Sequence, residues 1–275
     1  MILKRSELLN LNKTKTNFLT FLYEHNLQPP NTIVREERWY RPYEPSFFVQ
    51  ADSPGQSQLT VNHVILGLNQ AAMTMVLPAN GFFEAKISLI LNQRQIGTIE
   101  IYMGGSSYGT GVALEAAADS TTQALSTSYP TTNEIARGLV VDRTWPDMAV
   151  EWLYDEARSK AISENDMFTV IMSAFATASQ SSPHDYCQSL EAASSESGSG
   201  ATVGLVLGGP TVSKMLFLDV KTMLYLMYIK FIVSSGVYRE FSFELQHDVL
   251  DVHEIWGNGS ITIRGGGTSA VTATS

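Results

Sequence analysis

Residues whose types could support metal chemistry gather in HDVLDVHEI, residues 247–255. On a single strand, His247, Asp251 and His253 would share one face and could converge on an ion. Polar side chains that face solvent on an edge strand would produce the same sequence pattern. A metal site and a solvated edge strand are therefore the two alternatives. The sequence predicts no bound cofactor or metal.

Nucleophilic and phosphate-binding patterns are weak. The only cysteine, Cys187, follows His184 by three residues, and a thiolate–imidazole pair would require the two to touch. GLVLGGPTVSK, residues 204–214, resembles a glycine-rich turn before a helix. It lacks P-loop spacing, and Pro210 removes one N–H donor. A turn at the start of a helix is the favoured interpretation.

Carboxylates that could act as a catalytic pair occur in EWLYDEARSK, residues 151–160. The ribosome-inactivating N-glycosidases are a natural comparison in length and early elements, and their active helix carries Glu-Ala-x-x-Arg. Here Glu156 and Arg158 are only two residues apart, which turns them to different sides of a helix. That activity is therefore not carried over, and a hydrolase using Glu151 and Glu156 stays an alternative.

A segment near the N-terminus mixes cations with aromatic rings. Such a mixture could meet phosphate and stack on bases, or it could anchor an extended segment on apolar surface, which is favoured. The candidate binding residues are Arg35, Arg38, Trp39, Tyr40, Arg41, Phe47 and Phe48.

Composition limits the functional classes. The formal net charge of -9 and the pI of about 5.0 argue against binding nucleic acid by overall charge. One cysteine excludes an intrachain disulfide, and the first residues lack the order of a secretory signal. Residues 216–233 are apolar but contain Asp219, Lys221 and Lys230, so they predict a core helix rather than a membrane span. The expected location is a virion or the cytoplasm.

The pattern along the chain predicts mostly strands. Residues 81–105 give the strongest signal, because two alternating runs flank a polar centre and predict an antiparallel hairpin with one apolar face. Strands are also expected at 58–68, 71–78, 166–178, 237–252 and 259–264. Helices are expected in the first 28 residues, near 112–125 and at 211–233, whereas 179–201 predicts a loop. No internal repeat of 20–50 residues is evident.

These elements predict a strand-rich α+β fold, an antiparallel two-sheet sandwich of the jelly-roll kind with a core helix near 211–233. Residues 1–57 would form an N-terminal helix and aromatic arm, and residues 58–275 a single body. In pattern, the chain resembles viral coat proteins of the jelly-roll kind. That resemblance implies a self-assembling shell subunit, not an enzyme, whose partners are copies of itself and, through the arm, nucleic acid.

The alternative from another class is a β-sandwich module that binds carbohydrate or a cell surface. Its stacking platforms would be Tyr102, Tyr108 and Trp145, which lie beside loops rich in small polar residues.

Overall fold

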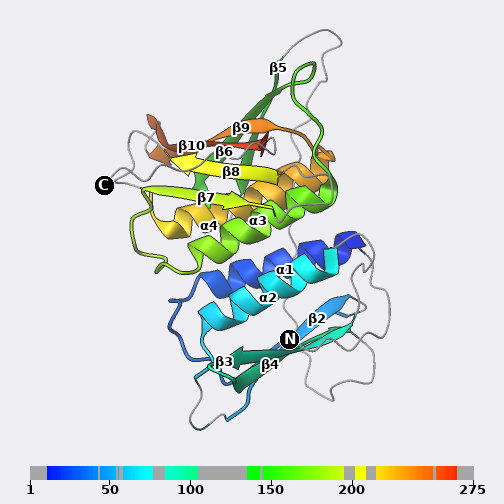
Figure 1. Cartoon of the computed structure of the whole chain (residues 1–275). Coiled ribbons are helices and arrows are strands. Elements are labelled where there is room, and N and C mark those ends of the chain that lie inside the picture. The colour runs from blue at the N-terminus through cyan, green and yellow to red at the C-terminus, as the bar shows by residue number, and fades with distance from the viewer. Residues whose placement is uncertain are drawn as a thin grey trace, which may run out of the picture.

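Two antiparallel sheets enclose two layers of helices in the computed structural model (Figure 1). It describes residues 11–42, 44–53, 55, 58–76, 84–104, 135–142, 145–194, 202–208, 215–249 and 252–264. The helices are α1 (Leu11–Asn26), α2 (Val61–Val76), α3 (Glu164–Ala178) and α4 (Phe217–Leu226), which continues as the π-helical segment η2 (Met227–Val233). The strands are β1 (Glu36–Trp39), β2 (Pro45–Ala51), β3 (Ala85–Leu91), β4 (Arg94–Met103), β5 (Ile135–Asp142), β6 (Trp145–Asp155), β7 (Ser189–Ala193), β8 (Thr202–Gly208), β9 (Phe241–Val249) and β10 (Val252–Arg264).

The chain is built from two similar halves. In the first half, the order of elements is α1-β1-β2-α2-β3-β4, and the strands lie side by side as β1-β2-β4-β3. In the second half, α3-β7-β8-α4-β9-β10 repeats that order, and its strands lie as β7-β8-β10-β9. The β5–β6 hairpin adds to this second sheet, because β6 pairs with β9. Each half contains a split β-α-β unit, in which the last strand lies between two strands joined by a helix.

Equivalent backbone hydrogen bonds support the repeat. In each half, two N–H groups at the start of the second helix and one after the first helix bond to matching carbonyls. The pairs are Val61 to Thr32 (3.0 Å) and Phe217 to Asp185 (3.0 Å), Asn62 to Pro30 (3.1 Å) and Leu218 to Pro183 (2.9 Å), and Val34 to Leu59 (2.9 Å) and Cys187 to Met215 (2.8 Å). The isolated bridges Ile33↔Thr60 and Tyr186↔Leu216 match as well.

The same β-bulge occurs in both halves. In the first sheet, the register shifts just after the Leu89↔Gly97 pair, and in the second sheet it shifts just after the Leu245↔Gly257 pair. Each glycine lies against the side chain that precedes the second helix. A Cβ on Gly97 would lie 2.8 Å from Leu59 Cδ2, and a Cβ on Gly257 would lie 2.9 Å from Met215 Sδ. A bulge shared at this position fixes the same local twist in both sheets.

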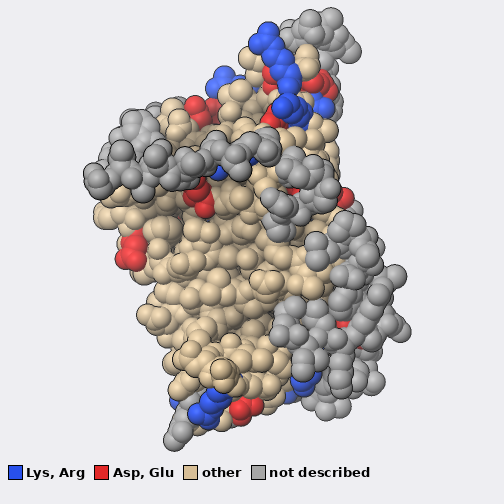
Figure 2. All heavy atoms as spheres, in the orientation of Figure 1, with Lys and Arg blue, Asp and Glu red and all other residues tan. Residues whose placement is uncertain are grey.

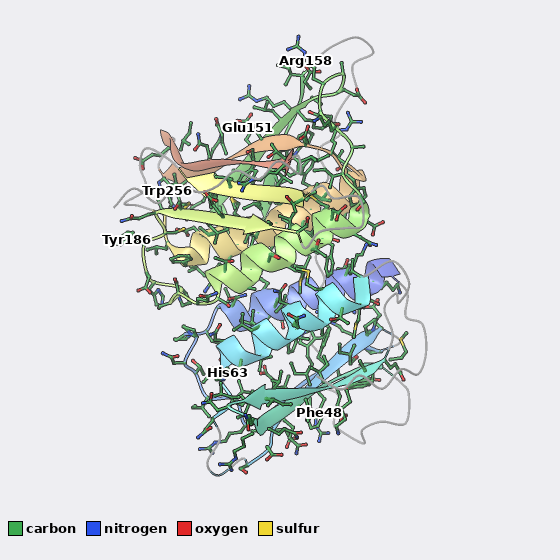
Figure 3. The ribbon with its side chains drawn as sticks, viewed as in Figure 1. Phe48, His63, Glu151, Arg158, Tyr186 and Trp256 are labelled. Atoms are coloured by element: carbon green, nitrogen blue, oxygen red, sulfur yellow. The ribbon has the colours of Figure 1, made fainter. Side chains whose placement is uncertain are left out.

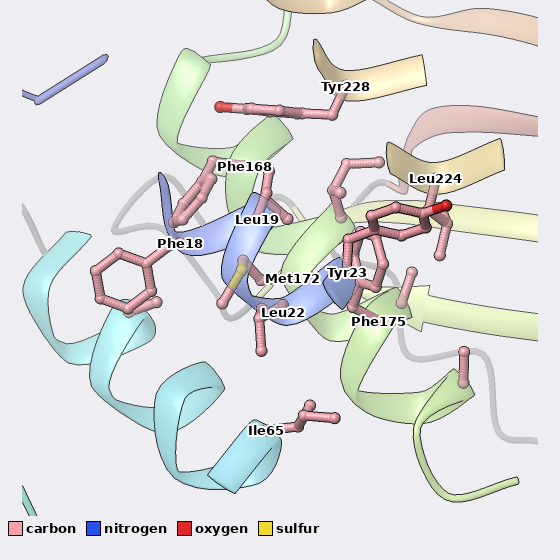
Figure 4. Close-up of a cluster of buried hydrophobic side chains, with 14 of the residues drawn as sticks. Phe18, Leu19, Leu22, Tyr23, Ile65, Phe168, Met172, Phe175, Leu224 and Tyr228 are labelled. Carbon is pink, nitrogen blue, oxygen red and sulfur yellow. The ribbon is translucent and has the colours of Figure 1, made fainter. Parts of the chain in front are cut away.

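The core lies where the helices of the two halves meet. Helix α1 contacts α3 and α4, and α2 contacts α3, so the helical layers pack face to face. The buried side chains of this layer include Phe18, Leu19, Leu22 and Tyr23 from α1, Ile65 from α2, Phe168, Met172 and Phe175 from α3, and Leu224 and Tyr228 from α4 and η2 (Figure 4). On the far side of the helices, the sheets add their own apolar faces to the same cluster.

Two buried lysines cross the boundary between the halves. Lys15 of α1 donates to Glu164 Oε1 at 2.7 Å and to Asn165 Oδ1 at 2.9 Å, at the beginning of α3. Lys221 of α4 donates to the carbonyl oxygens of Asn26, at 3.1 Å, and Ser181, at 3.2 Å, just where α1 and α3 end. A cation is favourable beside the carbonyl end of a helix. The two lysines thus tie the halves together at both ends of the helical layer.

Several expected elements take a different form. Residues 58–68 and 71–78 were predicted as strands, and the structure places residues 61–76 in α2. Likewise, residues 166–178 belong to α3. These segments are apolar on most sides because they pack between other helices and a sheet, and a continuous apolar run does not separate strand from helix. The predicted loop at 179–201 contains β7. The predicted helix near 112–125 lies outside the described residues.

The hairpin prediction for residues 81–105 is confirmed. Strands β3 and β4 pair across a turn at Asn92 and Gln93, both with positive φ, and Ile87 and Ile99 are buried on the face toward α2. The strand-rich α+β class with two antiparallel sheets is confirmed, as is a helix near 211–233. The jelly-roll detail is not confirmed, since helices separate the two sheets. Strand β1 pairs with β2 and β2 pairs with β4, so residues on both sides of the predicted boundary at residue 57 belong to one sheet.

Within the described ranges, no helix combines the length and the apolar composition that crossing a bilayer requires.

The matched glycines give a first prediction. Gly97→Ala should lower the free energy of unfolding by about 1–3 kcal/mol, because the added methyl meets the rigid Gln50 carbonyl oxygen at 2.8 Å. Gly257→Ala should cost less, since the atom it meets ends a flexible methionine. Urea unfolding measures both. Gly208→Ala is the control, as nothing lies within 4 Å of its added Cβ. Equal losses at Gly97 and Gly257 would contradict this account.

Lys221 gives a second prediction, on pH. Burial lowers the pKa of its ammonium from 10.5 to about 8, against the opposing pull of Asp185. Between these values the unfolded chain binds more protons than the folded chain, so the contribution of Lys221 to stability rises with pH. The stability of the wild type relative to Lys221→Met should therefore increase by up to about 1.4 kcal/mol per pH unit from pH 8 to 10. The exposed Lys86 provides the control: the stability of the wild type relative to Lys86→Met, measured by chemical unfolding, should not rise in this way between pH 8 and 10.

Candidate assembly edges and outer sheet faces

Each sheet ends in two edge strands, which are β1 and β3 in the first sheet and β5 and β7 in the second. An edge strand presents unpaired N–H and C=O groups, and proteins commonly protect such edges by keeping them short or charged. The edges at β1 and β7 have four and five residues, and β1 reads EERW. The edges at β3 and β5 have seven and eight residues. The two long edges are therefore the candidates for association.

The β5 edge exposes apolar side chains. Ile135 is 63% exposed and Leu139 is 48% exposed, and alternate positions of a strand share one face. Between them, the Arg137 guanidinium pairs with Glu151 of β6. This ion pair lowers the pKa of Glu151, whose second carboxylate oxygen accepts a hydrogen bond from Gln246 Nε2 at 2.8 Å. The hairpin is thus fixed to β9 while its outer edge stays open among the described residues.

The β3 edge has a similar character. Ile90 is 58% exposed on the face that points away from the helices. On the same face, Lys86 Nζ pairs with Glu100 Oε1 of β4 at 2.6 Å. Among the described residues, no strand pairs with the outer side of β3.

The outer face of the first sheet carries a row of cations, rings and carboxylates in register. Arg38, Phe48, Glu100 and Lys86 are cross-strand neighbours over all four strands. The Arg38 guanidinium lies 4.9 Å from the centre of the Phe48 ring, which belongs to β2 at the lower end of the molecule (Figure 3). Beside this row, burial raises the pKa of Tyr102.

The structure divides the predicted binding residues between two faces. Phe47 is buried against Phe18 and Phe21, and Trp39 packs on Phe21 and Phe47. Arg41 stacks 4.7 Å from the centre of the Trp39 ring. The others are solvent-accessible: Arg35, Arg38, Tyr40 and Phe48. Arg38 already pairs with Glu36 Oε1 at 3.1 Å, so little free positive charge remains on this face. The prediction of nucleic-acid binding stays untested.

The predicted carboxylate pair is not brought together by a helix. Glu151 lies within β6 and is held by Arg137, whereas Glu156 follows the end of that strand in an exposed turn. The lowered pKa of Glu151 keeps it ionised at neutral pH, which is unsuited to a general acid.

The metal alternative assumed a single strand across residues 247–253, whereas β9 ends at Val249 and β10 begins at Val252, so the two histidines lie on different strands. His247 pairs with Glu254 in the β9–β10 hairpin, and His253 occupies the neighbouring position opposite Asp248. The His247 ring stacks on Trp256, with 4.0 Å between ring centres. Asp251 lies outside the described residues. Among the described residues, no group of three or more His, Cys, Asp or Glu side chains could hold a metal ion.

Cys187 is buried in the core, and burial raises the pKa of its thiol to about 11. The thiol is therefore protonated at neutral pH and is no nucleophile. His184 is exposed. Of the proposed stacking platforms, Tyr102 lies on the outer face of the first sheet, whereas Tyr108 and the side chain of Trp145 lie outside the described residues.

The charged side chains seen in Figure 2 gather toward the two ends of the molecule, where the outer sides of the sheets lie. Few charged atoms appear between them, over the helical layers. On the face shown, the described residues form no single cationic surface for a polyanion.

Sequence reasoning missed Lys15 and Lys221 as buried groups, and it missed the β5 edge. The lysines carry no local signal, because a lysine on a predicted helix is ordinarily a surface residue. The edge had one signal, the exposed alternation of Ile135, Arg137 and Leu139.

No protein-family model matches the chain, and no curated protein matches it. One solved structure aligns weakly, described as a conserved protein of unknown function with hot dog fold from Alicyclobacillus acidocaldarius. The two are 8% identical over 92% of this chain and 86% of that chain, with a TM-score of 0.16. A likeness at that score carries no argument on fold or function.

Proposed function

We propose that the protein is a structural subunit that associates with copies of itself through its open sheet edges. The observation that carries this proposal is the β5 edge, an eight-residue strand whose outer side is unpaired among the described residues and which exposes Ile135 and Leu139. Long, apolar edges of this kind template pairing with another strand.

Strand addition at such an edge has two sources of free energy. It pairs the backbone groups that the edge presents, and it removes apolar side chains from water. Full burial of a leucine or isoleucine contributes about 1.5–3 kcal/mol each, so the two exposed residues of β5 offer a useful share of a subunit contact.

The viral coat interpretation is the finer form of this proposal. A shell wall needs a rigid unit with edges or faces that recur from copy to copy, and the two sheets on a packed helical layer provide such a unit. A jelly roll is not needed for that role, so the proposal extends to any closed shell, ring or filament.

The test substitutes a charge into the edge. Leu139→Lys should convert an associated species to a monomer, because an edge lysine opposes strand addition. Light scattering after size exclusion, over a hundredfold range of concentration, measures the mass. Leu66→Lys is the matched control, since Leu66 is 38% exposed but lies on helix α2 rather than on a sheet edge. Its mass should equal that of the wild type. A wild type that stays monomeric throughout would overturn the proposal.

A second candidate is a surface that binds carbohydrate on the outer face of the first sheet. It is favoured by the stack of Arg38 on Phe48 with Tyr102 beside it, because sugars pack on exposed aromatic rings.

Glycan-array binding tests this second candidate. Phe48→Ala should reduce binding about tenfold or more, since the stacking surface is lost, while Thr98→Ala on the same face should leave it unchanged. Circular dichroism confirms that both variants fold. An array without any bound glycan would remove the candidate.

A further inference from the structure

We propose that the β5 edge of one copy pairs with the β3 edge of the next copy, so that the six-stranded sheet of one subunit continues into the four-stranded sheet of its neighbour. This inference rests on the proposed self-association and names the surface that β5 meets. It follows from a difference between the two halves of the chain.

The repeat makes β3 and β9 equivalent strands. Each pairs with the last strand of its half, in the same register and with the same bulge, through Leu89↔Gly97 and Leu245↔Gly257. On its other side, β9 pairs with β6 over Met148–Leu153. The same side of β3 pairs with no strand among the described residues. The fold therefore shows, at the equivalent position, that an antiparallel strand fits there.

The equivalent positions on β9 and β3 carry a polar side chain in one case and an apolar side chain in the other. On β9, Gln246 stands at the position of Ile90, and its amide bonds to Glu151 of the added strand. On β3, Ile90 is exposed and has no such strand beside it among the described residues. The polar Gln246 suits the edge of β9, because its partner there is Glu151 of the same chain. The apolar Ile90 suits an edge that would receive the apolar side chains of β5 from another copy. Each proposed partner thus exposes apolar side chains on its outer face, Ile90 on β3 and Ile135 and Leu139 on β5.

The other two edges are less suited to this role. Strand β1 has four residues, with Glu36, Glu37 and Arg38 among them, and β7 has five. Short or charged edges resist strand addition.

A contact between β5 and β3 is heterologous, because each copy contributes a different edge. Every added copy leaves one free β3 and one free β5, so the assembly grows until it closes as a ring or continues as a filament. Two copies can form a closed dimer through this contact only if a two-fold rotation relates them, so that β5 of each copy meets β3 of the other.

Cross-linking between engineered cysteines distinguishes the possible contacts. Ile90→Cys lies on β3 and Leu139→Cys lies on β5, both at exposed positions, and native Cys187 is buried. The double variant, treated with a short bis-maleimide that tolerates a two-residue offset in register, should give a ladder of covalent dimers, trimers and larger species. Each single variant should stay monomeric on a denaturing gel, because a link needs one cysteine on each edge.

Each other result has a defined meaning. Covalent dimers from Leu139→Cys alone would show a β5–β5 contact, and dimers from Ile90→Cys alone would show a β3–β3 contact. Either would overturn the inference while leaving self-association intact. Particles seen by light scattering without any ladder from the double variant would place the contact elsewhere and also overturn it. A monomeric wild type would instead overturn the proposed function itself.

As an independent check, Ile90→Lys should reduce assembly as strongly as Leu139→Lys does, and Leu66→Lys on helix α2 should not. Loss of assembly in Leu139→Lys but not in Ile90→Lys would contradict a role for β3.

Discussion

The packing of the helices of one half against the helices of the other is the contact on which the rest of the structure depends. In the described part of the chain, helices lie between the two sheets, so the helical layer of each half covers the apolar face of its sheet. Lys15 and Lys221 lie within this contact and are fully enclosed, which is costly for cations unless they are well paired. Their partners are a carboxylate at the beginning of α3, the carbonyl of Asn26 at the end of α1 and the carbonyl of Ser181, which follows the end of α3. Such directional bonds fix how far one layer can slide along the other, which apolar packing alone does not do.

The two halves share a plan but present different surfaces. The internal faces match closely, down to the bulge and the glycine that accompanies it. The difference is at one edge, where the second sheet carries an additional hairpin and the first ends at β3. A molecule with two equal edges would favour two-fold pairs, whereas unequal edges direct a chain of copies. If copies associate as we propose, the asymmetry between the halves, rather than either half alone, would determine the kind of assembly.

The sequence was informative where one face of an element meets water. The β3–β4 hairpin alternates because its outer face is solvated, and it was predicted correctly with its apolar side. The sequence of helices α2 and α3 predicts strands, because both segments are rich in β-branched and other apolar residues on most of their faces. Val61, Val64, Ile65 and Leu68 have the spacing of one helix face, but apolar residues at the positions between them made that spacing hard to distinguish. The two halves share few identical residues at equivalent positions, because the repeat consists of matching backbone hydrogen bonds and strand register rather than of side chains. The edges could not be found because strand order depends on contacts that are distant in sequence.

The β9–β10 hairpin extends the plan of β3–β4 in a regular way. The first hairpin ends at the pair Leu91↔Arg94, which corresponds to His247↔Glu254, and the second continues through His253↔Asp248 and Val252↔Val249 before it turns. Each strand of the second hairpin is thus longer by two residues. Because hydrogen-bonded and non-hydrogen-bonded pairs alternate along an antiparallel ladder, a difference of two returns the same kind of pair to the end of the hairpin. A loop graft or epitope insertion at Asn92–Gln93 has a natural precedent within the same chain, provided that each strand grows in steps of two.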